Sequence, residues 1–342
     1  TCCAPCSSAI IEAMMQNGIT PVIYYCNPNI FPKEEYEIIV INDGSSDETG
    51  AIVEEIASGQ GNIRLFDQEN QGPSVARNYG MKLAKGEYLM FVDSDDTIER
   101  NCIRRLTDRC ISDDLDMLQF SAVNVIGKEH VRRMTYADTD KVVSGKSVLM
   151  KKIQVSIPFA LYKRSFMIGN DLKLYPGVYS EDDEFKTRAL YAAERVSSTN
   201  EIIYFVRQSP GSITRTVNPK KSYDCLTVIE SLGRFVQTTP DDRYRKGIYL
   251  QMSHTFNWCL KEMTGLPGPE VKKLEKLIYS KREMLGYLCK SPSLLHRVEG
   301  RIMRIFPRNI LKVYKTLNFL HFSKKSIVFI AIGILCIFNY RK

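Results

Sequence analysis

Acidic side chains follow two apolar segments of this chain. Residues 38–41 lead into Asp43, and residues 88–92 lead into Asp93 and Asp95. Continuous apolar segments bounded by turn-forming residues are typical of strands buried on both faces of a parallel sheet. Ligands of open α/β sheets bind where the strands end, and carboxylates clustered there suit a hard divalent cation that contacts phosphate oxygens. The pattern therefore predicts a site for a nucleotide with a metal ion.

Composition and charge place the basic residues at one end of the chain. The 342 residues are 44% hydrophobic, which is enough for one large domain or two. The formal net charge is +8, yet residues 301–342 alone contain nine Lys and Arg and no Asp or Glu. Nucleic-acid binding needs a basic face on the folded domain, so we exclude it. We expect an anionic membrane surface to be the partner of the basic tail.

The tail combines a basic amphipathic segment with a short apolar one. Apolar residues recur at helical spacing over residues 302–317 among Arg and Lys, which favours a helix lying on an anionic leaflet. Residues 327–338 carry no charge, but a bilayer span needs about 20 apolar residues. We expect a cytoplasmic protein that is peripheral on the inner face of the cell membrane. The alternatives are a C-terminal helix folded onto the domain and a true span.

Ten cysteines are distributed without the paired spacing of a zinc site. Cys2, Cys3, Cys6 and Cys26 are crowded near the start, whereas the others are scattered. Disulfide frameworks belong to small secreted domains, so we interpret the scattered cysteines as reduced thiols in the core of a cytoplasmic protein.

Strand-like and helix-like segments alternate as far as about residue 220, which is the signature of βαβ units in a wound α/β sheet. The expected helices cover residues 7–17, 50–58, 73–84, 99–110, 145–152 and 181–192, and the expected strands cover residues 22–26, 38–41, 63–66, 88–92, 117–125, 159–162 and 202–206. Variable polar sequence lies between residues 126 and 144, and helical periodicity dominates after residue 220. We therefore expect a nucleotide-binding and catalytic domain over residues 1–220, a helical region over residues 221–300 and a membrane-associating tail over residues 301–342.

Six motifs in a fixed order resemble the family 2 glycosyltransferases, a large inverting family on the GT-A fold. They are EIIVINDGSSDET at residues 37–49, NQGPSVARN at 70–78, GEY at 86–88, FVDSDD at 91–96, EDDEF at 181–185 and SITR at 212–215. Each motif alone is weak, but together they cover roughly residues 34–216 in the family's order. The resemblance implies a Rossmann-like wound mixed sheet flanked by helices and followed by a helical C-terminal part.

The resemblance implies roles for the acidic strand ends and for one arginine. Asp95 matches the direct metal ligand, and Asp93 matches the residue that contacts the ribose and metal-bound water. Asp43 matches the position that binds the nucleobase, because a carboxylate can accept the imide N–H, and Asp47 is expected at the nucleotide as part of the same motif. Arg77 matches the family arginine near the nucleotide, although it could instead pair with Asp43 or Asp47 to hold the loop.

The resemblance makes Asp182 the catalytic base, with Glu181 beside it. A carboxylate at this helix start would lie next to the sugar, and its acidic neighbour could raise its pKa toward the working range. Without the resemblance, an ordinary acidic first turn favoured by the helix dipole explains the same residues. Arg215, with Arg207 as the alternative, is expected to close over the diphosphate.

The implied reaction is an inverting transfer of a sugar from a nucleotide-diphosphate sugar, typically a UDP-sugar, to a saccharide or lipid-linked acceptor. A divalent cation, Mn²⁺ or Mg²⁺, would neutralise the departing diphosphate, and a base would activate the acceptor hydroxyl. The resemblance also implies a place in bacterial surface polysaccharide assembly. One alternative is a sugar-1-phosphate nucleotidylyltransferase, but the sequence shows no glycine-rich basic phosphate loop. The other is a catalytically impaired nucleotide-sugar-binding protein.

The N-terminal segment departs from the family pattern. Family members begin with an apolar strand, then a helix, then the strand before Asp43, whereas here the helix expected at residues 7–17 comes first. Either the first strand is missing, which would leave open hydrogen-bonding edges in the sheet, or residues 22–26 take its place in a rearranged order.

Overall fold

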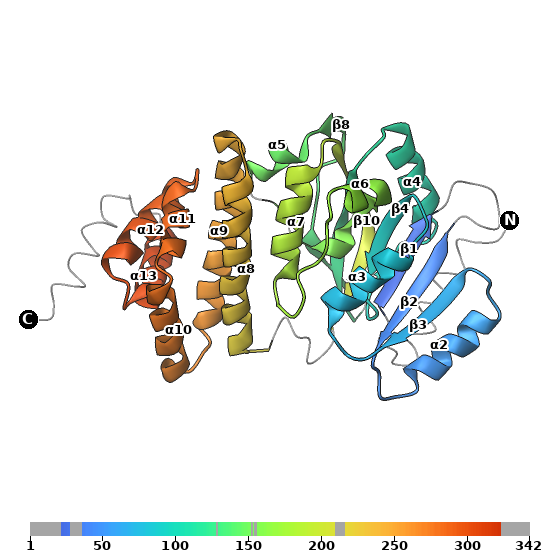
Figure 1. The fold of residues 1–342 in the computed structure, drawn as a ribbon, viewed down its shortest axis with the longest axis horizontal. Helices are drawn as coiled ribbons and strands as arrows, with labels where there is room; N and C mark the ends of the chain where they lie inside the picture. The colour runs from blue at the N-terminus through green and yellow to red at the C-terminus, as the bar shows by residue number, and fades with distance from the viewer. Residues whose placement is uncertain are drawn as a thin grey trace, which may run out of the picture. The chain divides into compact units, whose positions relative to one another are not determined.

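Figure 1 shows the computed structural model, in which the chain divides into two compact units. The structure describes residues 22–27, 36–127, 129–151, 153, 156–208 and 216–322. The first unit comprises Thr1–Val148, Ile153–Gly177 and Glu181–Arg215, and the second comprises Leu149–Lys152, Val178–Ser180 and Thr216–Lys342. The helix expected at residues 7–17 lies outside the described residues.

Ten strands in the described part of the first unit form one mixed sheet, which confirms the predicted fold class. Their order is β3-β2-β1-β4-β9-β6-β10-β5, with β7 beside β6 and β8 beside β10. β2 is parallel to β3 and β6 is parallel to β10, whereas the other pairs are antiparallel. The strands are β1 (Val22–Asn27), β2 (Glu37–Asp43), β3 (Ile63–Gln68), β4 (Tyr88–Val92), β5 (Thr97–Ile98), β6 (Met117–Ile126), β7 (Glu129–Met134), β8 (Thr139–Val143), β9 (Ala160–Lys163) and β10 (Val196–Arg207).

β1 has a central place in this part of the sheet. β1 lies between β2 and β4 and is antiparallel to both. Residues 22–27 therefore fill the space between β2 and β4, as the alternative of a rearranged order expects. Because β1 runs opposite to both neighbours, β2 and β4 point in the same direction. Their carboxyl ends, which carry Asp43 and Asp93, lie at one edge of the sheet.

Burial of β2 and β4 follows the apolar pattern of their sequences. All five residues of β4 are buried, as are the five inner residues of β2. Residues 126–144, which the sequence left without assigned structure, form the end of β6 and the strands β7 and β8. The side chains of β7 are almost all exposed, so its sequence lacks the apolar alternation that indicates a half-buried strand.

Five helices described in the first unit begin within three residues of their predicted starts, and a sixth, at Arg164–Gly169, was not predicted. They are α2 (Thr49–Ser58), α3 (Pro73–Leu83), α4 (Cys102–Ser112), α5 (Gly145–Leu149), α6 (Arg164–Gly169) and α7 (Glu181–Ala192), with a 3₁₀ turn at Ile157–Phe159. Gly72 precedes α3 with a φ of +87°, a conformation that glycine adopts without strain, and Pro73 fixes a helical φ in the first turn. α3 contacts β1 and β2 and so begins near the end of β2.

The second unit is helical in its described part. Its helices are α8 (Pro219–Thr238), α9 (Asp242–Met263), α10 (Gly268–Ser280), α11 (Glu283–Lys290), α12 (Leu294–Ile305) and α13 (Ile310–Phe322). The described helices include none that is long and apolar enough to cross a membrane. Cys225 and Cys259 here, and Cys102 and Cys110 in the first unit, are buried free thiols, as expected.

The amphipathic segment expected at residues 302–317 is two helices rather than one. α12 ends at Ile305 and α13 begins at Ile310, with Pro307 between them. Val313 and Leu317 are buried, so this apolar face packs within the second unit. Val313 and Leu317 thus belong to a helix folded onto the second unit, whereas Ile305 at the end of α12 is exposed. Attachment of the tail to a membrane stays a prediction.

Candidate active site

The carboxyl end of β4 is followed by three aspartates that differ in exposure. Asp93 is partly buried, Asp95 is exposed and Asp96 is buried. Partial desolvation, followed by the negative charge of Asp93, raises the pKa of Asp95. Burial, with the charges of Asp93 and Asp95, raises the pKa of Asp96 to about 8. The strand end therefore places three carboxyl groups in one turn, of which Asp96 is largely protonated at neutral pH.

Arg77 connects this strand end to the first turn of α7. It projects from α3 with its side chain 7% exposed. Its Nη2 donates to Asp93 Oδ1 at 2.6 Å, and its Nη1 donates to Glu181 Oε1 at 3.0 Å. These ion pairs differ from the alternative predicted from the sequence, in which Arg77 would pair with Asp43 or Asp47. One buried guanidinium thus brings together two predicted site residues that lie far apart in the sequence.

Asp43 shapes the loop that leads into α3. Its Oδ1 accepts hydrogen bonds from Gln68 Nε2 at 2.7 Å and from the backbone N–H of Gln71 at 2.9 Å. Its Oδ2 accepts from the backbone N–H of Gly72 at 2.8 Å. A carboxylate held by three donors has a fixed direction, so Asp43 ties the end of β2 to the segment before Arg77.

Asp47 lies apart from the Arg77 ion pairs, two residues before α2 begins. Its Oδ1 accepts from the Thr49 backbone N–H at 3.0 Å and from the Thr49 hydroxyl. These hydrogen bonds lower the pKa of the exposed Asp47 carboxyl. The structure therefore gives Asp47 a local role at the start of the helix, which the sequence motif does not distinguish from a role in nucleotide binding.

Asp182 lies in the first turn of α7, beside Glu181. Burial, together with the negative charges of Glu181 and Asp93 and against the opposing effect of Arg77, raises the pKa of Asp182 to about 7. Such a group can accept a proton near neutral pH. Both interpretations from the sequence remain consistent with this position, because the first turn of a helix also favours acidic residues.

Lys186 was missed by the sequence reasoning. It lies one turn after Asp182 on α7, is completely buried, and donates from Nζ to the Ser156 carbonyl at 3.4 Å. Its Nζ is 5.9 Å from the centre of the Tyr162 ring. Burial lowers the pKa of Lys186 to about 8, against the opposing effect of Asp182. The one available signal was its spacing of four residues from Asp182, which places two side chains on one helix face.

The residues present fit a hard divalent cation. Asp93 and Asp95 supply carboxylate oxygens at one strand end. Desolvation and then the negative charge of Asp93 raise the pKa of Asp95, and a cation would offset that charge. Within the described residues no group of three or more His, Cys, Asp and Glu side chains could hold a metal on its own. Cations such as Mg²⁺ commonly use one or two carboxylates and complete their coordination with phosphate oxygens and water.

Only one of the two arginines expected near the diphosphate lies among the described residues. Arg215 lies outside the described residues. Arg207 ends β10, and its backbone N–H donates to Asp96 Oδ1 at 2.9 Å. The structure therefore ties the backbone of Arg207 to the acidic turn after β4.

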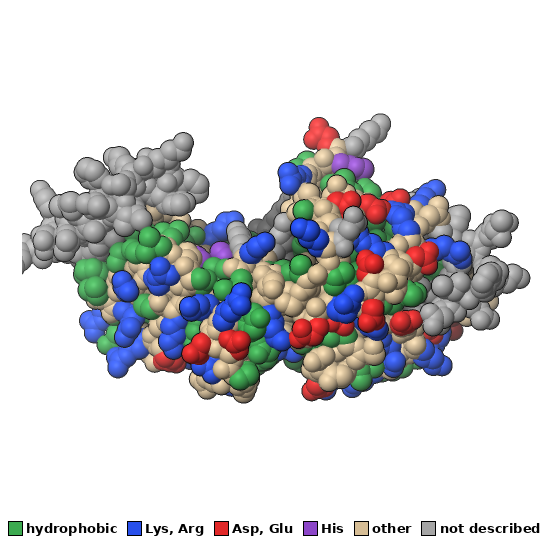
Figure 2. All heavy atoms as spheres, turned by 90° about the horizontal axis from the view of Figure 1, so that it is seen from above, with side chains coloured by type: hydrophobic (Ala, Val, Ile, Leu, Met, Phe, Trp, Pro, Cys, Tyr) green, Lys and Arg blue, Asp and Glu red, His purple; other side chains and the backbone are tan. Residues whose placement is uncertain are grey.

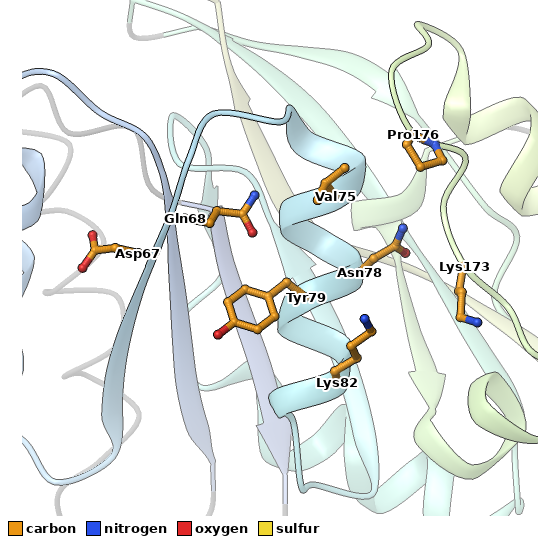
Figure 3. Close-up of a pocket in the computed structure, with 8 residues that line it drawn as sticks. All are labelled: Asp67, Gln68, Val75, Asn78, Tyr79, Lys82, Lys173 and Pro176. Atoms are coloured by element: carbon orange, nitrogen blue, oxygen red, sulfur yellow. The ribbon is translucent and has the colours of Figure 1, made fainter.

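A pocket of about 570 Å³ lies in the first unit, where Figure 3 shows α3 between β3 and a loop of residues 173–176. Its lining residues are Asp67, Gln68, Val75, Asn78, Tyr79, Lys82, Lys173 and Pro176. Asn78 donates to the Leu174 carbonyl at 2.9 Å and accepts from the Leu174 N–H at 2.8 Å. None of the predicted site residues lines this pocket, so we assign it no part in the chemistry.

A wound mixed α/β sheet with carboxylates at its strand ends, connected by a buried arginine, defines a GT-A-type domain. Residues 14–168 match the family model described as Glycosyl transferase family 2. This part of the chain is thus similar to the family 2 glycosyltransferases. The matched range includes Asp43, Arg77 and the aspartates after β4, whereas Asp182 lies beyond it.

Curated relatives are also named glycosyltransferases. The chain is 30% identical over 213 residues to the uncharacterised glycosyltransferase EpsJ of Bacillus subtilis, covering 58% of this chain and 60% of EpsJ. It is 29% identical over 216 residues to the uncharacterised glycosyltransferase YibD of Escherichia coli, covering 58% of this chain and 62% of YibD. The matches thus span about three fifths of each of these relatives.

A solved structure shares the fold. TarS of Staphylococcus aureus in complex with UDP-GlcNAc superposes with a TM-score of 0.67 and 19% identity, covering 87% of this chain and 85% of that one. At this identity the likeness shows the fold alone. It extends over more of the chain than the family model does.

Proposed function

We propose that this chain is an inverting glycosyltransferase that moves a sugar from a nucleotide-diphosphate sugar to an acceptor hydroxyl. The observation that carries the proposal is the pair of contacts made by Arg77. They connect Asp93, at the proposed diphosphate end, with Glu181, the neighbour of the proposed base Asp182. Donor binding and proton transfer would thus share one cluster of charges.

On this proposal, the donor binds across the ends of β2 and β4. Asp43 contacts the nucleobase, and Asp93 and Asp95 hold a divalent cation, Mn²⁺ or Mg²⁺. When bound, the cation supplies neutralising charge at the diphosphate. Arg77 fixes the direction of the Asp93 carboxylate, and Arg215 stays an expected contact of the diphosphate. Asp47 has the least support among the proposed donor-binding residues, because its hydrogen bonds from Thr49 already account for its position.

Asp182 would remove the proton from the acceptor hydroxyl. A base works best when its pKa lies near the working pH, and burial raises the pKa of Asp182 to about 7. Glu181 would not take the proton itself. Its ion pair with Arg77 and its charge beside Asp182 give it a supporting role.

We infer that the donor is a UDP-sugar and that the product belongs to bacterial surface polysaccharide synthesis, with a saccharide or lipid-linked acceptor. Support comes from relatives. TarS has been solved with UDP-GlcNAc, and its name describes a poly(ribitol-phosphate) β-N-acetylglucosaminyltransferase, 26% identical over 205 residues. The nucleotidylyltransferase alternative has no support from the family match. A catalytically impaired binding protein would bind the same donor but would not consume it.

A panel of nucleotide sugars tests donor binding. Each compound is added with and without Mn²⁺ while thermal unfolding is followed. A ligand at a hundred times its dissociation constant stabilises a folded site by about 2.7 kcal/mol. We expect at least one UDP-sugar to stabilise the chain in a manner that depends on the cation. Stabilisation by another nucleoside diphosphate sugar alone would contradict the UDP assignment, and stabilisation by none would contradict the proposed donor site.

Replacing the buried Lys186 is expected to stabilise the fold at neutral pH and to shift the pH dependence of sugar transfer. Its folded-state pKa of about 8 lies below its ordinary 10.5, so its cost to folding is complete below pH 8 and fades as the pH rises toward 10.5. Lys186→Met should therefore raise the free energy of unfolding at pH 7 by on the order of 1–3 kcal/mol. Losing the ammonium should also raise the pKa of Asp182 and move the acidic limb of the pH–rate profile to higher pH.

Chemical denaturation and a pH–rate profile check this prediction. Lys163→Met is the matched control, because Lys163 pairs with the exposed Asp114 outside the Arg77 cluster. We expect the control to leave the acidic limb in place. A destabilised Lys186→Met protein with an unchanged profile would contradict the assignment of a costly ammonium beside Asp182.

We propose that the chain is cytoplasmic and binds the inner face of the cell membrane peripherally. Figure 2 shows blue basic side chains beside green apolar ones on the surface of the second unit. On α12, Leu294 and Ile305 are 52% and 69% exposed, and Arg301 and Arg304 are exposed as well. Residues 323–342, outside the described part, add four positive charges and the apolar residues 327–338.

Sedimentation with lipid vesicles tests the membrane proposal. The full chain should sediment with anionic vesicles, and a chain ending at Phe322 should bind them less, because each Lys or Arg near the surface contributes about 1 kcal/mol. The cut keeps the buried residues of α13, so the shorter chain retains its described helices. Added salt should weaken binding without abolishing it, since screening acts on charges alone. Equal binding by both chains would show that residues 323–342 do not contribute to membrane binding.

A further inference from the structure

The end of β10 holds the segment that follows β4. β5 pairs antiparallel with β10, with Ile98 opposite Tyr204. Farther along β10, the backbone N–H of Arg207 donates to Asp96 Oδ1 at 2.9 Å. The acidic turn is therefore fixed to a strand that lies about a hundred residues away in the sequence.

The hydroxyl of Tyr204 lies at the centre of this attachment. It accepts a hydrogen bond from the backbone N–H of Asp93 at 2.8 Å and bonds to the carboxyl group of Asp96. The turn is closed by a second bond, from the Asp96 N–H to the Asp93 carbonyl at 3.0 Å. Tyr204 is completely buried, and Asp96 is 5% exposed. One buried hydroxyl thus contacts both ends of the turn.

This attachment fixes the backbone from which two proposed cation ligands project. Asp93 is the first residue after β4, and its N–H bonds to a side chain. A phenylalanine in place of Tyr204 would leave that N–H and the Asp96 carboxyl without this partner. Buried polar groups that lose a partner are costly, so the turn would shift to find another. Asp93 and Asp95 would move with it.

We propose that Tyr204 is a positioning residue that sets the geometry of the cation and diphosphate end of the donor site. The inference rests on the proposed function, in which Asp93 and Asp95 hold the cation. Because Tyr204 is completely buried, it touches neither donor nor acceptor and acts through the turn. It differs in this from Arg77, which contacts the Asp93 carboxylate directly.

Thermal unfolding of the full chain with UDP and Mn²⁺ tests the proposal, with UDP alone and Mn²⁺ alone as references. Tyr204→Phe is compared with wild type and with Tyr88→Phe. Tyr88 is 2% exposed at the opposite end of β4, and its hydroxyl donates to the Cys110 carbonyl at 2.9 Å. The control therefore removes a similarly buried hydroxyl from the same sheet without touching the acidic turn.

We expect Tyr204→Phe to need at least about tenfold more UDP for half of the Mn²⁺-dependent stabilisation, because a buried hydrogen bond of the turn is lost. Tyr88→Phe should keep the wild-type UDP dependence. If Tyr204→Phe only lowered the stability of the fold, its UDP dependence would match that of Tyr88→Phe.

The outcomes separate failure of this proposal from failure of the proposed function. An equal UDP dependence in Tyr204→Phe and wild type overturns the positioning role and leaves the function standing. Absence of Mn²⁺-dependent stabilisation in wild type overturns both. If Tyr204→Phe does not fold, Asp96→Asn replaces it, since asparagine keeps an acceptor for the Arg207 N–H. That variant should weaken UDP binding similarly, and a wild-type response in it overturns the proposal.

Discussion

Asp182→Asn is expected to reduce sugar transfer by about 10² to 10⁴ while the chain still binds its donor and cation. The amide cannot take a proton from the acceptor hydroxyl, but it keeps the size and position of the carboxylate. In the wild-type chain, transfer should fall as the pH drops through about 7, because protonation of Asp182 removes the base. Initial rates over pH 5–9 and donor titrations measure both effects.

Asp183→Asn is the control for this experiment. Asp183 shares the first turn of α7 with Asp182, so the control removes one negative charge from the same turn. It should keep transfer within a few-fold of wild type and lower the pH of the acidic limb, because Asp183 contributes to the raised pKa of Asp182. Loss of donor binding in Asp182→Asn would instead place Asp182 in the nucleotide site.

Asp95→Asn is expected to abolish the dependence of donor binding and turnover on the divalent cation. An amide oxygen is a weaker ligand for a hard cation than a carboxylate, and the turn would lose one of its two proposed ligands. Because Asp95 is exposed and its pKa is already raised, removing its charge should not lower the unfolding temperature. Cation titrations with and without UDP, followed by thermal unfolding, measure the change.

The matched control is Asp108→Asn, an exposed acidic residue on α4. It should leave the cation dependence as in wild type, which shows that one lost negative charge elsewhere has no effect. Undiminished, cation-dependent activity of Asp95→Asn would show that Asp95 is not a ligand of the cation.

The sequence predicts those parts of the fold that depend on neighbouring residues. Apolar segments bounded by turn formers indicate β2 and β4, and both are buried as the pattern requires. Gly72 followed by Pro73 marks the start of α3. The acidic residues of the site follow from the same logic, because side chains at the carboxyl ends of neighbouring strands with one direction meet at one edge.

Pairings between distant segments could not be predicted from these patterns. Nothing local indicates that β1 runs antiparallel between β2 and β4. The contact between Arg77 and Glu181 joins residues 104 positions apart, and the sequence suggested Asp43 or Asp47 instead. Tyr204 sits in a strand whose pattern explains its burial but not the partner of its hydroxyl.

Release of UDP measures the central claim most directly. The full chain is incubated with the UDP-sugar that stabilises it best, with Mn²⁺ or with a chelator, and free UDP is followed over time. Many sites of this kind hydrolyse their donor slowly without an acceptor, so the assay needs no knowledge of the acceptor. We predict cation-dependent UDP release by the wild-type chain and none above background by Asp95→Asn. No release by the wild type from any nucleotide sugar, or release that Asp95→Asn and Asp182→Asn leave unchanged, would contradict the account.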